Sequence, residues 1–195
     1  MKSLLRFVFV ACVAILFSGF TVAQQPVAPP PMPAADGPSL VATMQFIEKK
    51  LNELGTVNFA AYLHDNADGT DSTDQVGIEY SNVVADPVAC RIAYHRKAVD
   101  KSDAKSMEEN LSLNLRDVQD LVVMPGEQRL KKINTASGHT TLDARVDPPI
   151  FVLVARKVGN QENSFIFFDE EMANRVAKAI THAVELCGGG NQDKF

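Results

Sequence analysis

Apolar residues recur with helical spacing near the end of the chain. Successive members lie four, four, three and four residues apart, and polar residues occupy most of the positions between them. The residues with this spacing are Met172, Val176, Ile180, Ala183 and Cys187. They share one face of a helix, which Asp169 can cap at its start and Gly188 can end in the left-handed conformation. The pattern predicts an amphipathic helix over residues 169–187 with a buried apolar face.

A second helical pattern lies nearer the N-terminus. Its apolar residues are Leu40, Met44, Ile47, Leu51 and Leu54. Ser39 is suited to the N-cap position and Gly55 to the end of the helix. We expect a helix over residues 39–54 that packs on its own domain. A short coiled-coil dimer uses the same pattern and is the alternative.

Strand patterns fill the region between these helices. Alternating or continuous apolar stretches cover residues 57–63, 76–85, 88–97, 111–115, 121–124, 150–154 and 164–168. They predict about seven antiparallel strands, which form a β-barrel or sandwich over residues 56–168. Residues 130–135 are expected to pair with 121–124 across Pro125-Gly126. Residues 140–146 have mixed polarity and receive no assignment.

The first 23 residues have the organisation of a secretory signal peptide. Lys2 and Arg6 precede an apolar run over residues 7–17, and small residues lead to Ala23, where cleavage is expected. An uncleaved membrane anchor is the alternative, although the run is short for a membrane-spanning helix. Export to the periplasm or secretion follows from this interpretation.

Residues 24–38 are rich in proline and alanine, a composition that predicts an extended linker. A single α+β domain is then expected over residues 39–190, followed by a disordered tail over 191–195. Without residues 1–23 the chain keeps 17 basic residues against 24 acidic ones, a formal charge of −7. This balance argues against binding to nucleic acid or to anionic lipid.

Two cysteines, Cys90 and Cys187, remain after signal-peptide removal. Cys90 alternates with Ile92 and Tyr94 on the expected inward face of the strand over residues 88–97, and Cys187 lies on the buried stripe of the final helix. An even number of cysteines in an oxidising compartment predicts a disulfide between them. Two separate buried thiols are the alternative.

Candidate chemistry is sparse. The loop over residues 65–74 carries Asp65, Asp68, Asp71 and Asp74 around Gly69, but its spacing does not match a calcium-binding loop, and a solvated hairpin is the preferred interpretation. The histidines lie far apart with no metal-ligand spacing: His64, His95, His139 and His182. We therefore predict no catalytic residues, no metal site and no cofactor, and interpret the chain as a non-enzyme.

The order of about seven antiparallel strands and a closing helix resembles the pleckstrin-homology-like barrel. The runs Phe168-Asp169-Glu170-Glu171-Met172-Ala173 and Leu186-Cys187-Gly188-Gly189 also resemble the ending of an uncharacterised group of exported bacterial proteins. The chain departs from pleckstrin-homology domains because it has no Trp, and its first hairpin loop has no Lys or Arg. Phosphoinositide binding is therefore not expected. A cystatin-like or helix-grip fold is the alternative architecture.

The expected function is binding of a protein or peptide in the cell envelope, because small barrels of this kind offer a groove beside the helix and free strand edges. Two other hypotheses remain open. A helix-grip or cystatin-like protein would carry an apolar ligand or host a small hydrolytic site in a cavity between helix and sheet. A structural accessory would have no ligand.

Overall fold

The computed structural model describes residues 37–136, 138 and 142–190. The expected signal peptide over 1–23, nearly all of the linker over 24–38 and the tail over 191–195 lie outside the described residues.

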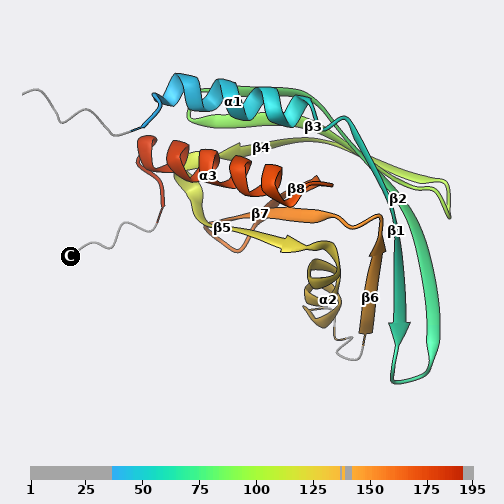
Figure 1. Cartoon of the computed structure of the whole chain (residues 1–195). Coiled ribbons are helices and arrows are strands. Elements are labelled where there is room, and N and C mark those ends of the chain that lie inside the picture. Colours follow the sequence, from blue (N-terminus) through green and yellow to red (C-terminus); the bar gives the residue numbers. More distant parts are fainter. Residues whose placement is uncertain (1–36, 137, 139–141, 191–195) are drawn as a thin grey trace, which may run out of the picture. The chain divides into compact units, whose positions relative to one another are not determined.

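Five antiparallel strands form the larger sheet, in the order β4-β3-β2-β1-β6. They are β1 (Thr56–Asp65), β2 (Thr70–Asp86), β3 (Arg91–Asp100), β4 (Lys105–Asn114) and β6 (Leu142–Asp147). The first four strands follow one another as hairpins, whereas β6 adds to the other side of β1. β2 continues well beyond its pairing with β1, and the long strands curve along their length (Figure 1).

Three antiparallel strands form the smaller sheet, in the order β5-β7-β8. They are β5 (Val118–Pro125), β7 (Phe151–Lys157) and β8 (Glu162–Phe167). Residues 152–155 of the central strand are buried on both faces, as expected of a strand covered on two sides. Leu153 packs in the cluster that includes the final helix, whereas Val154 packs with residues of β1 and β6.

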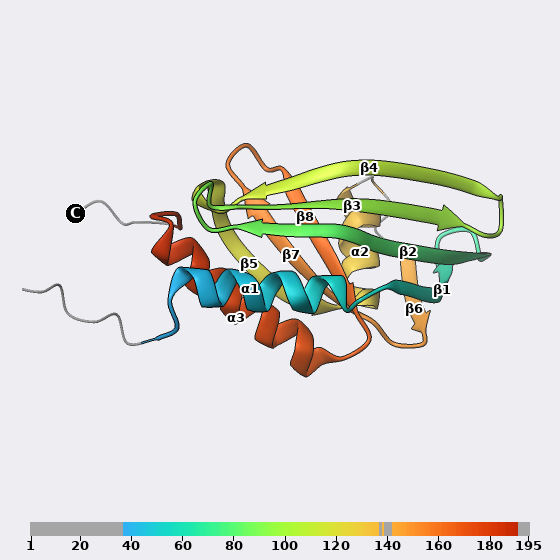
Figure 2. The same cartoon turned by 90° about the horizontal axis from the view of Figure 1, so that it is seen from above.

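Three α-helices accompany the sheets: α1 (Leu40–Asn52), α2 (Gly126–Ala136) and α3 (Glu170–Leu186). α1 and α3 pack against each other, α1 also contacts β2, and α3 contacts all three strands of the smaller sheet (Figures 1 and 2). The expected caps are confirmed, because Ser39 Oγ accepts from Ala42 N at 3.3 Å and Asp169 Oδ1 accepts from Met172 N at 2.8 Å.

The main core lies between the two sheets and the helices α1 and α3. Val176, Ile180 and Ala183 of α3 are fully buried, and Met172 is half-buried, which confirms the predicted apolar face. The rings of Tyr80 and Phe165 are 5.7 Å apart, so the two sheets also meet directly. Burial of each large apolar side chain contributes roughly 1.5–3 kcal/mol, so removing α3 would expose the core and unfold the protein.

Helix α1 supplies hydrogen-bond partners for the end of β2 that pairs with β3 but extends beyond β1. This end contains a β-bulge between Ser81 and Val84, where the backbone cannot keep a regular ladder. Asn52 of α1 bonds both backbone groups of Val83, and Glu48 Oε2 accepts from Ala85 N at 2.8 Å. Two polar side chains on α1 therefore serve as hydrogen-bond partners for the backbone of this strand edge. Without them, its N–H and C=O groups would be buried and unsatisfied.

The α+β class is confirmed, but of the expected barrel or sandwich the barrel is not formed, because the two sheets do not close on each other. Among the described residues no strand pairing joins the five-stranded sheet to the three-stranded one. The reason lies in the connections: a 3-10 helix, η1 (Leu115–Asp117), separates β4 from β5, and β6 pairs with β1 instead of joining the smaller sheet. The structure has eight strands in its described part, whereas about seven were expected.

Residues 130–135 are helical, so the strand expected there is wrong. They belong to α2, which starts directly after β5 and packs on β6. Most residues around this position are good helix formers: Glu127, Gln128, Arg129, Lys131 and Lys132. Leu130 packs in the smaller core cluster. The unassigned region contains β6, whose described residues begin at Leu142.

The third strand begins three residues later than expected, at Arg91. Asp86 Oδ1 accepts from Val88 N at 2.8 Å and from Ala89 N at 3.0 Å, and these bonds form a turn over residues 87–90. Cys90 therefore lies at the end of this turn, with a φ of 52°, and not within the strand. It is nevertheless buried, as the alternation with Ile92 predicted.

Candidate functional site

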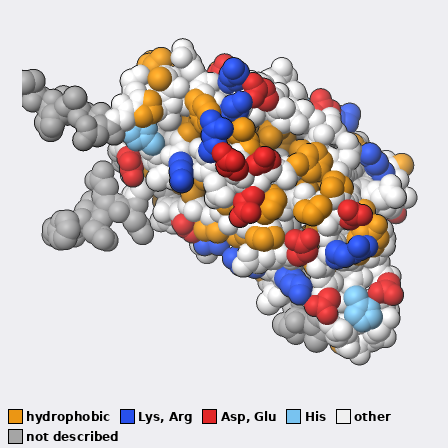
Figure 3. Space-filling view, viewed as in Figure 1, with side chains coloured by type: hydrophobic (Ala, Val, Ile, Leu, Met, Phe, Trp, Pro, Cys, Tyr) orange, Lys and Arg blue, Asp and Glu red, His pale blue; other side chains and the backbone are white. Residues whose placement is uncertain are grey.

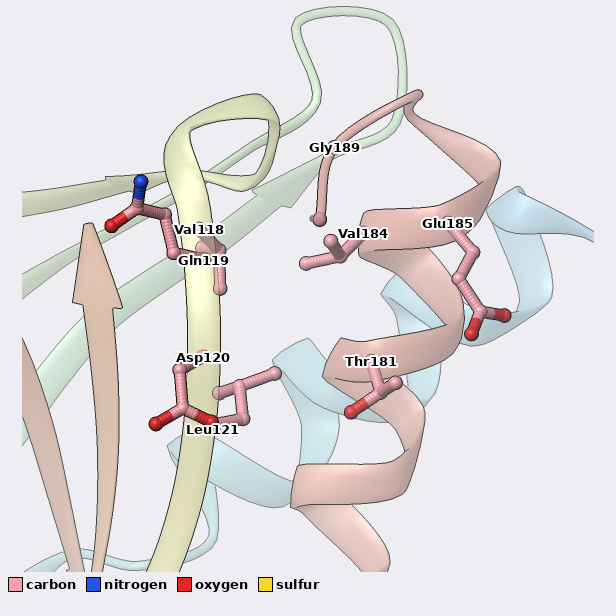
Figure 4. Close-up of a pocket in the computed structure, with 9 residues that line it drawn as sticks. Val118, Gln119, Asp120, Leu121, Thr181, Val184, Glu185 and Gly189 are labelled. Carbon is pink, nitrogen blue, oxygen red and sulfur yellow. The ribbon is translucent and has the colours of Figure 1, made fainter. Parts of the chain in front are cut away.

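A groove lies between β5 and the C-terminal half of α3 (Figure 4). Its volume is about 460 Å³, within the range of about 300–1,000 Å³ typical of ligand sites. Its lining comes from β5, from α3 and from the turn that follows α3: Val118, Gln119, Asp120, Leu121, Thr181, Val184, Glu185, Gly189 and Gly190.

The groove has an apolar floor and a polar rim. Val118 and Val184 are buried side chains that belong to the main core, and Leu121 packs against the same core. Thr181 and Glu185 lie along α3 on the opposite side of the groove from β5 (Figure 4). This combination suits a ligand with apolar groups that face the floor and polar groups that face solvent.

The rim carries negative charge. Glu185 is an exposed carboxylate, with 69% of its side chain accessible. Asp120 Oδ2 pairs with Arg156 Nη1 at 3.0 Å, and the same guanidinium also pairs with Glu162 Oε1 at 3.3 Å. Burial raises the pKa of the Glu162 carboxyl, but Arg129 and Arg156 outweigh burial, so this pKa is below its ordinary value and the carboxyl is ionised at neutral pH.

One edge of β5 has free backbone groups. β5 pairs with β7 on one side only, and alternate backbone groups of an edge strand point away from its partner. Gly190 N donates to Val118 O at 3.2 Å at the start of this edge. Within the described part of the chain, no residue outside β7 hydrogen-bonds to the backbone of residues 119–124. The groove therefore follows an unpaired strand edge.

The turn after α3 closes one end of the groove. Gly188 has a φ of 74°, the left-handed conformation that glycine adopts without steric cost, and ends the helix as expected. Gly189 N donates to Val184 O at 2.8 Å. A Cβ atom at Gly189 would lie 2.3 Å from Leu115 O, so only glycine fits against η1 at this point.

The predicted disulfide between Cys90 and Cys187 is present and anchors this end of the groove. The two Cα atoms are 5.9 Å apart, and the bond joins the turn between β2 and β3 to the end of α3. Leu115 N also donates to Cys90 O at 2.9 Å, so the same turn holds the start of η1. The disulfide thus fixes α3 and, through η1, the beginning of β5 relative to each other.

The other residues that the sequence singled out are not brought together. His64 Nδ1 is 2.8 Å from Asp71 Oδ1 on the first hairpin, His95 lies on β3, and His182 lies on α3. His139 lies outside the described residues. In the described part of the chain, no three His, Cys, Asp or Glu side chains are placed to share a metal ion.

The first hairpin is confirmed, but its turn is shorter than expected. β1 and β2 pair up to Asp65 and Thr70, so Asp71 and Asp74 lie within β2 and not in a loop. Asp65 Oδ1 accepts from Ala67 N and Asp68 Oδ1 accepts from Thr70 N, each at 2.9 Å. These two carboxylates stabilise the turn that contains them.

Sequence reasoning did not find the lining residues of the groove. Gln119, Asp120 and Thr181 have no motif, because their proximity depends on how the second sheet meets the final helix. The only sequence signal was the run Gly188-Gly189-Gly190, which predicts a close backbone approach after α3.

No helix in the described part of the chain has the length and apolar character needed to cross a membrane. Comparisons with models of known protein families, with curated proteins and with solved structures gave no match to the chain.

Proposed function

We propose that the protein is an exported, non-enzymatic interaction module that binds an extended segment of a protein in the cell envelope. The segment adds as a strand to the free edge of β5 and lies in the groove between β5 and α3. The observation that carries the proposal is the coincidence of that free edge with the apolar floor formed by Val118, Leu121 and Val184. Strand addition uses backbone bonds for affinity and side-chain pockets for selectivity.

The charge of the rim restricts the class of peptide. Asp120 on β5 is already paired with Arg156, whereas Glu185 on α3 is an exposed carboxylate, so a cationic side chain in the ligand gains a favourable contact on the α3 side of the groove. Alternate residues of an added strand face the same way, which suits a peptide with apolar residues toward the floor. We therefore propose a partner segment in which Lys or Arg alternates with apolar residues.

A variant of the pleckstrin-homology-like fold is the architecture that supports this role best. Four consecutive antiparallel strands, a second sheet and a C-terminal helix follow the order of that fold. The differences are the added α1 and the placement of β6 beside β1. The basic cluster of phosphoinositide-binding members has no counterpart in the first hairpin here, so we do not extend lipid recognition to this chain.

Export to the periplasm or beyond is part of the same proposal. It is supported by the sequence pattern of residues 1–23 and by the disulfide, because disulfides persist in oxidising compartments. The filled core between α3 and the sheets favours the interaction module over a carrier with a ligand inside the fold. A structural accessory without a ligand would leave the β5 edge unused.

Site-specific crosslinking tests the proposal. A photoreactive amino acid replaces Gln119, which is exposed on β5, and in a matched protein it replaces Gln128, which is exposed on α2. We expect light-dependent crosslinks to a defined envelope protein from position 119 and none from position 128. Equal crosslinking from both positions, or none from position 119, contradicts the proposal.

A substitution that fills the groove provides the second readout. Thr181→Trp places a large side chain in the groove and should abolish the crosslink from position 119. Asn174→Trp is the matched control, because Asn174 lies two turns earlier on the exposed side of α3. The side chains of Thr181 and Asn174 each donate a hydrogen bond to the backbone oxygen four residues earlier, so both substitutions remove the same kind of bond. Persistence of the crosslink in Thr181→Trp contradicts this placement of the site.

A further inference from the structure

A second groove lies between α1 and α3, lined on the α3 side by Lys178, Ala179 and His182 and distinct from the groove beside β5. Its volume is about 410 Å³. Ala42 and Ala179 face it from the two helices, and Phe46 lines it from α1. Because Ala42 and Ala179 have small side chains, they do not fill the space between α1 and α3, and a channel remains.

A buried hydroxyl in the lining of this groove lacks a partner. Thr43 is 3% exposed, and its Oγ1 makes no hydrogen bond within the described part of the chain. A buried hydroxyl without a partner is unfavourable by about 1–3 kcal/mol, and most such groups in folded proteins are satisfied. A ligand oxygen in the groove would be the acceptor that this hydroxyl lacks.

Two cationic side chains, Arg175 and Lys178, lie along the α3 side of the groove. Their spacing of three residues places them on one face of the helix, and His182 follows four residues later on the same face. Neither Arg175 nor Lys178 makes an ion pair with a described residue. The Arg175 guanidinium lies 5.8 Å from the Phe46 ring centroid, beside the apolar lining. Figure 3 shows Lys and Arg side chains, with Asp and Glu side chains between them, beside hydrophobic surface over the two helices.

His182 is already oriented by the chain. Its Nε2 donates to Pro38 O at 2.9 Å, because a carbonyl oxygen can only accept. Its Nδ1 is 3.9 Å from Glu185 Oε2. Lys178 therefore contributes a cation to the lining of the groove, and this cation has no ion-pair partner among the described residues.

We propose that the groove between α1 and α3 binds one free long-chain carboxylate, with its hydrocarbon chain over Ala42, Phe46 and Ala179 and its head group at Lys178. Charge complementarity supports an anionic head, because the Lys178 ammonium lines the apolar channel and the Arg175 guanidinium lies beside the Phe46 ring, and neither makes an ion pair with a described residue. A bilayer is a poorer occupant, since the surrounding surface carries carboxylates and the net charge repels anionic lipid.

Calorimetry with dodecanoate below its micelle concentration tests the proposal on protein purified from cells that express the full chain. We expect saturable binding of one molecule per chain. Decanoate, which is shorter by two methylenes, should bind about fifteenfold more weakly, because each buried methylene contributes roughly a factor of four. Dodecyltrimethylammonium, with the same tail and a cationic head, should bind at least about fivefold more weakly. Absence of saturable dodecanoate binding overturns the proposal, as does equal affinity for the cationic amphiphile.

Variants locate the binding. Ala179→Leu fills the channel and should abolish binding, while Ala136→Leu at the exposed end of α2 is the control for added hydrophobic volume. Lys178→Gln should weaken binding about three- to fivefold, and Lys132→Gln on α2 should not change it. Unfolding curves verify that each variant is folded. Unchanged binding in a folded Ala179→Leu, or binding only to phosphatidylglycerol vesicles, overturns the proposal.

The inference is independent of the peptide-binding proposal. Thr181→Trp, which fills the groove beside β5, should leave dodecanoate binding unchanged, and Ala179→Leu should leave crosslinking from position 119 unchanged. Failure of one proposal is therefore distinguishable from failure of the other.

Discussion

Asn52 on α1 makes two hydrogen bonds with the backbone of Val83 on β2. Its Nδ2 donates to Val83 O at 2.9 Å, and its Oδ1 accepts from Val83 N at 3.1 Å. An amide side chain reproduces here the pair of bonds that a neighbouring strand would make. The β-bulge that turns the end of β2 away from regular pairing is therefore linked directly to the first helix.

Replacement of Asn52 by Ala should destabilise the protein. Both backbone groups of the buried Val83 lose their partners, and each unsatisfied buried group costs about 1–3 kcal/mol. We expect the free energy of unfolding in urea to fall by about 2–4 kcal/mol. Asn174→Ala is the control, because Asn174 bonds only the exposed backbone oxygen of Glu170, and this variant should lose less than about 1 kcal/mol. Equal losses in the two variants would contradict this role.

Removal of the disulfide should destabilise the protein and loosen the groove beside β5. The bond closes a loop with a sequence separation of 97 residues, and in the chain-entropy model this contributes roughly 4.7 kcal/mol. We expect Cys90→Ala with Cys187→Ala to lower the free energy of unfolding by about that amount. Reducing agent should produce a similar loss in the natural protein and none in the double variant. Mass spectrometry of the non-reduced protein provides the direct check, and two free thiols would refute the bond.

Gly189→Ala should disrupt the contact between the end of α3 and η1. The added Cβ would meet the backbone oxygen of Leu115, which cannot rotate away as a side chain can. Overpacking of this kind costs about 1–3 kcal/mol, measurable as a loss of unfolding free energy. Gly188→Asn is the matched control, because Asn tolerates a positive φ and nothing lies within 4 Å of a Cβ at this position. A larger loss in the Gly188 variant would contradict the packing argument.

The turn that holds Cys90 should weaken in acid. Backbone N–H groups of Ala89 and Val88 bond the Asp86 carboxylate and hold its pKa below the ordinary value. A lowered pKa in the folded state means that the stabilisation is present above the ordinary Asp pKa of about 3.9 and is lost as pH falls through the lowered folded value. The difference in melting temperature between the natural protein and Asp86→Ala should therefore be largest near neutral pH and shrink below about pH 4. If the difference in melting temperature instead grew as the pH fell, the proposed role of the ionised Asp86 carboxylate would be contradicted.

Local sequence patterns correctly predicted those features that depend on residues close together in the sequence. The face of α3 with Val176 and Ile180 and the caps at Ser39 and Asp169 followed from spacing and from hydrogen-bond chemistry. The disulfide followed from alternation around Cys90, although the turn formed by Asp86 shifted the start of its strand. The prediction from alternation still holds after this shift, because Cys90 in the turn and Ile92 in the strand are both buried.

Long-range choices were not predictable from local patterns. The barrel is the clearest case, because pairing of β6 with β1 is decided by the whole arrangement of sheets. The same holds for the groove beside β5, since Asp120 and Thr181 line one groove only once the second sheet and α3 are both in place. The strand expected over residues 130–135 is a different case, because Leu130 and Ile133 are three residues apart, a spacing that places them on one face of a helix but on opposite faces of a strand, so the local pattern favoured α2.

The pairing of β6 with β1 also sets an order of assembly. Strands β1 to β4 join neighbours in the sequence, so each hairpin can form as soon as its residues are available. β6 joins β1 only after the chain has passed through β4, β5 and α2, and closing so long a loop is entropically slower. We therefore expect the four-stranded meander β1 to β4 to form first and β6 to join it late in folding.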